Sequence, residues 1–119
     1  MRLAEHDWLD TLQWMICRAN PTDSQTAVMA IKGGHNAELH NQNDLGSLIV
    51  HVGGESLITD LGPRRYDRSN FDENRYTHFV NASRGHSVPI VNGCEQGMGK
   101  TFAALDKRAG QGWRLRAYA

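Results

Sequence analysis

The chain has 119 residues, of which 39% are hydrophobic, and its 13 Lys and Arg residues balance its 13 Asp and Glu residues. This length suits one domain and is too short for an eight-fold α/β barrel, and the zero net charge disfavours a non-specific nucleic-acid binder, which carries a basic excess. No apolar run reaches the roughly 18 residues of a transmembrane helix, the charged N-terminus shows no signal-peptide segment, and Cys17 and Cys94 lie too far apart for a zinc knuckle or disulfide framework.

Residues 1–20 are predicted to form an N-terminal helix, set before a β domain over residues 21–119. The apolar residues of this first segment recur at roughly helical spacing: Leu3, Trp8, Leu12, Met15 and Ile16. Asn20 and Pro21 then end the helix, because proline cannot continue one. The pattern indicates a packing helix.

Short apolar segments separated by turns predict antiparallel strands in the middle of the chain. These segments are residues 26–32, 47–52, 55–60, 75–80 and 86–91. Gly53 and Gly54 form a two-residue hairpin signal between the second and third segments. Pro89 lacks an N–H to donate, so the last segment is expected at a sheet edge or a bulge.

The C-terminal stretch gives a weaker pattern. Residues 101–108 are compatible with one or two helical turns, and the alternation in residues 113–118 predicts a last strand. Five basic residues and one Asp fall in residues 100–119, which is typical of a solvated face. Since an antiparallel sheet must bury its apolar face against another layer, the expected fold is mainly all-β, an antiparallel β-sandwich with a short N-terminal helix.

Polar side chains concentrate in a predicted loop between two strands, where functional groups are often carried. The loop holds His35, Glu38, His40, Gln42 and Asp44. His40 is the candidate catalytic residue, because an imidazole takes up and returns protons near neutral pH.

Asp60 and His86 stand at the ends of two predicted strands. Together with Gln42 they offer a carboxylate, an imidazole and an amide oxygen, which makes a possible zinc site. The alternative is that these polar residues only stabilise turns, since His and Asn side chains often bond to nearby backbone groups. The spacing leaves both interpretations open.

Two other motifs match only in part. Residues 94–101 end in Gly99, Lys100 and Thr101, as a nucleotide-binding P-loop does, but Cys94 stands where the first glycine belongs. A cupin-like metal site would need a second histidine where Gln42 stands. Both alternatives are therefore weak.

Three segments of the sequence resemble, in order and spacing, the β-sandwich domain of the heparinase II/III-like polysaccharide lyases. They are residues 34–47, residues 57–62, and residues 83–93 followed by Gln96. The resemblance covers about residues 27–100. It implies the C-terminal sandwich of an enzyme that cleaves uronic-acid-containing glycans, such as heparin, heparan sulfate or alginate, by β-elimination, and that is periplasmic or secreted.

The resemblance also implies roles for individual residues. His40 matches the sandwich histidine at the catalytic cleft, and Gln42, Asp60 and His86 match the ligands of a structural zinc, with Gln42 in place of a histidine. The family's catalytic tyrosine belongs to an (α/α) toroid domain, which has no counterpart in these residues. We therefore expect a sandwich fragment or remnant with little activity alone. The alternative is a non-catalytic module that binds acidic glycans or a protein partner, with contributions from Arg64, Arg65, Arg68 and Arg75.

Overall fold

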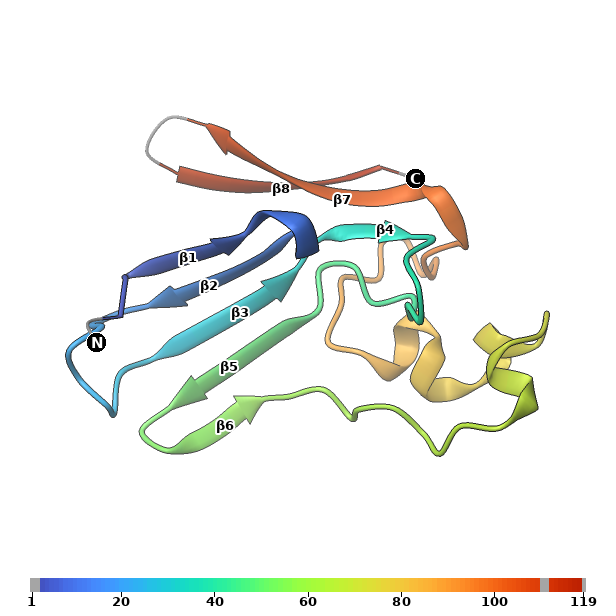
Figure 1. Ribbon diagram of the computed structural model, residues 1–119, viewed down its shortest axis with the longest axis horizontal. Coiled ribbons are helices and arrows are strands. Elements are labelled where there is room, and N and C mark those ends of the chain that lie inside the picture. Colours follow the sequence, from blue (N-terminus) through green and yellow to red (C-terminus); the bar gives the residue numbers. More distant parts are fainter. Residues whose placement is uncertain (1–2, 110–111, 119) are drawn as a thin grey trace.

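The computed structural model describes residues 3–109 and 112–118, with side chains described up to residue 104. These residues form two antiparallel sheets (Figure 1). The larger sheet contains, in spatial order, β1 (His6–Leu9), β2 (Trp14–Arg18), β3 (Val28–Lys32), β5 (Leu48–Val52) and β6 (Glu55–Ile58). The smaller contains β4 (Gly34–Asn36), β7 (Gly99–Ala109) and β8 (Gly112–Tyr118).

The mainly β architecture predicted from the sequence is confirmed. The segments predicted around residues 26–32, 47–52 and 55–60 are β3, β5 and β6, and the last predicted strand is β8. Gly53 and Gly54 connect β5 to β6 with φ values of 59° and 86°. Two successive positive φ angles match the right-handed twist of the flanking strands, and glycine adopts them without steric cost.

The predicted N-terminal helix is wrong, because residues 6–18 form the hairpin β1–β2. A single turn of 3-10 helix, η1 (Asp10–Leu12), connects the strands and ends at Gln13 with φ of 53°. β2 pairs along its whole length with β3, so that Met15 faces Ile31 across the ladder. Short apolar runs fit either periodicity, and here the pairing with β3 decides for a strand.

The strands predicted over residues 75–80 and 86–91 are also absent. The chain instead forms short 3-10 turns: η3 (Arg75–Thr77), η4 (Phe79–Asn81) and η5 (Ser83–Gly85), preceded by η2 (Arg68–Asn70). Their N–H groups bond locally, as when Gly85 donates to the Ala82 carbonyl at 2.9 Å. His86 and Ser87 lie in a bend, residues 88–90 belong to no strand, and the Leu48 N–H donates to the Ser87 carbonyl at 3.0 Å.

Residues 101–108 lie in strand β7 rather than in helical turns. A P-loop needs a helix directly after its Lys-Thr pair. Lys100 and Thr101 instead lie within β7, so the nucleotide-binding alternative is excluded.

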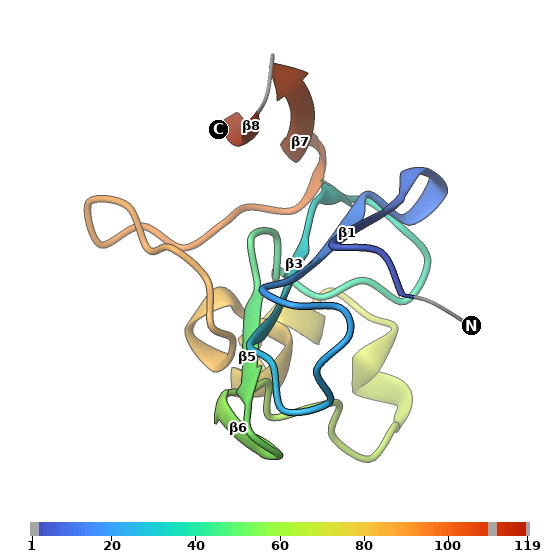
Figure 2. The same cartoon turned by 90° about the vertical axis from the view of Figure 1, so that its left-hand side faces the viewer.

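One glycine allows the two sheets to meet. Gly33 joins β3 to β4, and its N–H donates to the Gln13 carbonyl at 2.7 Å. A Cβ at this position would lie 2.8 Å from the Ala104 carbonyl oxygen and 2.9 Å from that of Gln13. Only glycine fits between these two backbones, so β4 leads the chain from the larger sheet to the smaller. Figure 2 shows the β7–β8 hairpin standing off from the larger sheet on this connection.

The buried side chains that the structure describes are more often polar than apolar. Among the described side chains, the buried apolar ones are Met15, Leu45, Ala82 and Ala104, whereas six buried residues are polar. Many large apolar side chains are exposed, including Leu39, Leu57 and Leu61. The radius of gyration, 15.4 Å, exceeds the value of about 13.5 Å for a compact chain of this length. None of the described helices is long and apolar enough to cross a membrane.

Candidate functional site

The three segments singled out in the sequence lie together beyond the end of the larger sheet. The loop after β4 contacts residues 81–97 through a buried hydrogen-bond network. The segment after β6 reaches the same region through Asp60, which bonds to His86. These segments, up to about 60 residues apart in sequence, thus form one polar cluster. The tertiary fold brings their side chains into contact.

Gln96 is the centre of this network. Its side-chain amide donates to the Leu45 carbonyl at 2.7 Å, and its amide oxygen accepts from the Leu45 N–H at 3.0 Å. The Gln96 carbonyl accepts from the side chain of Asn43 at 3.0 Å, and its N–H donates to the Ser83 hydroxyl at 3.1 Å. Ser83 is fully buried and donates to the Asn43 carbonyl at 2.8 Å. Buried polar groups that are satisfied in this way fix the loop in one conformation.

His40 lies exposed on this ordered loop, in the left-handed region with φ of 57°. The Tyr66 and Phe71 rings stand edge-on to its imidazole, with centroids at 6.4 and 6.0 Å, and stack on each other at 5.8 Å. Within the described part of the chain, no protein group hydrogen-bonds to the imidazole. Both ring nitrogens are therefore open to a ligand or to proton transfer.

The residue after His40 is held by two side chains that the sequence analysis did not assign to it. Arg75 donates to the Asn41 carbonyl, and the Tyr76 hydroxyl donates to the Asn41 side-chain oxygen at 3.0 Å. The Arg75 guanidinium also lies 5.2 Å from the Tyr76 ring centroid. These contacts fix the backbone beside His40. The density of Arg and Tyr in residues 64–76 was the only signal for them in the sequence.

Asp60 and His86, two of the three predicted metal ligands, are paired. The His86 Nδ1 lies 2.6 Å from the Asp60 Oδ2, and the His86 side chain is only 1% exposed. In the tautomer in which Nδ1–H donates to this carboxylate, Nε2 carries the lone pair of the imidazole. Nε2 is buried and has no hydrogen-bond partner among the residues that the structure describes. A carboxylate that orients a histidine in this way is common behind metal ligands.

Gln42, the third predicted ligand, donates to the Asn81 side-chain oxygen at 3.3 Å. Within the described residues no three His, Cys, Asp or Glu side chains form a group that could hold a metal ion. A zinc ion at His86 would therefore need an amide ligand such as Gln42, or water.

The other polar residues of the loop stabilise turns and strands. The Ala37 N–H donates to the His35 Nδ1 at 3.2 Å, and the Glu38 carboxylate accepts from the His35 N–H at 3.2 Å. Asp44 forms an ion pair with Lys32 at 2.6 Å. The contacts of His35 and Glu38 are those of residues that stabilise a turn.

The four arginines considered for binding differ in their availability. Arg64 pairs with Asp67 at 2.6 Å and Arg75 binds the Asn41 carbonyl. The Ser69 hydroxyl, with further help from the Ser69 N–H and Arg64, holds the pKa of Asp67 below its usual value, against an opposing effect of desolvation. Arg65 and Arg68 are exposed, and no side-chain partner is found for them within the described residues.

Comparison with known proteins finds no matching protein-family model and no matching curated protein.

Proposed function

We propose that this chain is the β-sandwich portion of a heparinase II/III-like polysaccharide lyase, with His40 as its contribution to proton transfer. The observation that supports the proposal is that the three resembling segments contact one another, two of them through the loop that carries His40. In this proposal the two antiparallel sheets would form the layers of the sandwich. Activity requires the toroid domain, because half a cleft leaves reacting groups misplaced, and misplacement alone costs about 10²-fold.

The exposed aromatic side chains beside His40 support the proposal that another domain packs against this surface. Tyr66 and Phe71, which flank His40, are 52% and 64% exposed. Large apolar side chains grouped beside a site mark a surface that another element covers. A toroid packed here would enclose His40 between two domains, which excludes water from the reaction.

The chemistry that His40 would serve is β-elimination at a uronate. A base takes the proton on C5, the electron pair forms the C4–C5 double bond, and the C4–oxygen bond breaks. The leaving oxygen is then protonated. A positioned imidazole suits either transfer and contributes about 10²–10⁴-fold to the rate. The left-handed backbone of His40 and the bonds to Asn41 would hold it in place.

A structural zinc fits part of the site. Nε2 of His86 is buried without a partner among the described residues, and Asp60 bonds to the other ring nitrogen. Gln42 would supply a neutral amide oxygen. Zinc there would fix the segments after β6 and before β7 relative to the His40 loop. Because an amide is a weaker ligand than imidazole, we expect lower affinity than for a site with two histidines.

The test is an NMR titration of the chain with an oligosaccharide of uronic acids. We expect the His40 ring signals to shift saturably, whereas those of His51 in β5 stay in place and serve as the internal control. Unmoved His40 signals would contradict the proposal. In a protein that also carries the toroid, His40→Ala should lower turnover by about 10²–10⁴-fold, and unchanged turnover would exclude His40 from catalysis.

A non-catalytic module that binds acidic glycans is the second candidate, favoured by the exposed Arg65 and Arg68. Guanidinium groups bind carboxylates and sulfates in a bidentate manner. Under this alternative, Arg65→Ala and Arg68→Ala weaken oligosaccharide binding, whereas His40→Ala does not. Under the lyase proposal, the NMR signals of the His40 ring shift when the glycan binds.

A further inference from the structure

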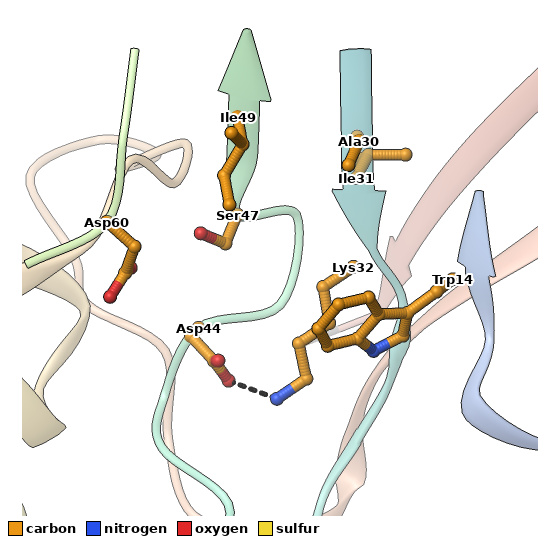
Figure 3. A pocket seen from close by; sticks show the side chains of 8 residues that line it. All are labelled: Trp14, Ala30, Ile31, Lys32, Asp44, Ser47, Ile49 and Asp60. Atoms are coloured by element: carbon orange, nitrogen blue, oxygen red, sulfur yellow. Dashed lines mark hydrogen bonds and ion pairs between the residues drawn. The ribbon is translucent and has the colours of Figure 1, made fainter. Parts of the chain in front are cut away.

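A small pocket opens on the larger sheet, and His40 does not line it. Its volume is about 200 Å³. Figure 3 shows its lining, which consists of Trp14, Ala30, Ile31, Lys32, Asp44, Ser47, Ile49 and Asp60. Trp14 pairs with Lys32, and Ala30 pairs with Ile49, across neighbouring strands. The alternation of strand residues therefore places these four side chains on one face of the sheet.

The pocket has one flat aromatic wall. The Trp14 side chain is 39% exposed, and its indole lies beside the Lys32 side chain (Figure 3). Ala30 and Ile49 continue the apolar surface next to it. Tryptophan combines a large apolar face with one N–H donor, and here that N–H has no protein acceptor within the described residues.

The remaining walls are polar. Lys32 and Asp44 form an ion pair at 2.6 Å, with side chains only 14% and 16% exposed. Ser47 and Asp60 come from the side of the pocket opposite Trp14 (Figure 3). The Ser47 hydroxyl has no protein partner in the described part of the chain, and Lys32 has two N–H donors beyond the ion pair. Donors and acceptors thus alternate around one apolar face.

The charges of the pocket select against anions. Its lining contains one lysine and two aspartates, and the lysine is already paired with Asp44. Asp60 is turned toward His86, and its second oxygen accepts from the Gly62 N–H at 2.8 Å. A carboxylate or sulfate in this pocket would meet like charge without a free cation to balance it.

We propose that this pocket binds a single neutral pyranose unit, stacked on Trp14. The C–H face of a pyranose carries partial positive charge, which the negative face of an indole attracts. Each ring hydroxyl both donates and accepts, so it can bond to Lys32, Asp44 and Ser47 in turn. The volume fits one small ring, since pockets for drug-sized ligands measure about 300–1,000 Å³.

The test is saturation-transfer NMR on the full chain with methyl β-glucoside, compared with glucuronic acid. We expect saturation of the pyranose C–H protons with a Kd on the order of millimolar, and at least tenfold weaker binding of glucuronic acid. Trp14→Ala should abolish the transfer. The matched control is Trp8→Ala, because Trp8 faces Met15 across the β1–β2 ladder and so lies on the other side of the sheet. A thermal melt confirms that each variant folds.

A second variant tests the charge argument without altering the aromatic wall. Asp44→Asn keeps an oxygen for Lys32 and removes one negative charge. We expect methyl β-glucoside binding within about threefold of wild type and binding of glucuronic acid strengthened by about tenfold, equivalent to about 1.4 kcal/mol. No transfer to methyl β-glucoside in the wild type, preference for glucuronic acid, or transfer retained in folded Trp14→Ala each overturns the proposal. His40 takes no part, so His40→Ala leaves this binding unchanged.

Discussion

The polar cluster around Gln96 and the larger sheet are stabilised in opposite ways. In the cluster, Ser83 is fully buried and the neighbouring asparagines are almost so, and hydrogen bonds satisfy most of their polar groups. In the larger sheet, backbone ladders join the strands, yet Met15 is the one buried side chain among the residues of β1, β2, β3, β5 and β6.

This difference shows which part of the molecule is complete by itself. The cluster satisfies most of its buried polar groups internally, with the Asn36 and Asn43 side-chain oxygens as exceptions among the described residues. Each bond there is costly to lose because the alternative is an unpaired polar group away from water. The sheet leaves apolar area in water on which further packing would add stability. The His40 loop is therefore positioned by hydrogen bonds more than by a hydrophobic core.

Removing the centre of the polar cluster gives the largest expected effect. Gln96→Ala leaves the Leu45 N–H and carbonyl without partners, and we expect the free energy of unfolding to fall by about 3 kcal/mol. Urea denaturation measures this change. Gln25→Ala is the matched control, because Gln25 is exposed and its substitution should change stability by less than about 0.5 kcal/mol. Equal effects at both positions would show that the network contributes nothing.

Truncating the buried methionine of the sheet gives a smaller loss. Met15→Ala should cost about 2 kcal/mol, the low end for a buried methionine, because the surrounding sheet is partly open and can relax. Leu57→Ala in β6 should cost less than about 0.5 kcal/mol, since Leu57 is 66% exposed. A loss at Met15 larger than at Gln96 would reverse the comparison between cluster and sheet.

Acid should weaken the edge of the cluster only slightly. Hydrogen bonds from Arg84, chiefly from its guanidinium at 2.5 Å, hold the pKa of Glu95 below its usual 4.5 despite an opposing effect of desolvation. A lowered pKa in the folded state means that this contribution is present above about pH 4.5 and is lost as pH falls through the folded value. Urea midpoints measured from neutral to acidic pH should fall slightly less for Glu95→Gln than for wild type. An identical pH dependence of the two proteins would argue against the contribution.

The sequence predicted a hairpin where the turn residues themselves favour one. Gly53 and Gly54 specified a hairpin, and the structure contains it. The segment that begins at Trp8 carries no comparable turn signal, and its apolar spacing fits a helix as well as a strand. Pairing with β3 makes this segment a strand, and β3 lies too far along the sequence for a local pattern to include it.

The candidate site was predicted in composition but not in geometry. The sequence proposed Asp60 and His86 as metal ligands at strand ends, whereas the structure pairs them with each other and places His86 outside any strand. The contacts of Arg75 and Tyr76 with Asn41 were missed, because they join a loop to a 3-10 turn 34 and 35 residues away. The pocket beside Trp14 draws on four separate segments, and no spacing rule connects them.

The sequence by itself determined the β class, the hairpin turn at Gly53 and Gly54, and the polar residues of the His40 loop, because these depend on local backbone preference and side-chain chemistry. Only the tertiary structure decided that residues 6–18 form a β-hairpin and that Gln96 links the His40 loop to Ser83. It also decided that Trp14 and Asp60 share a pocket. Those outcomes depend on which backbone groups find partners across long sequence separations, and the energy of such pairing exceeds the small local preferences that a sequence displays.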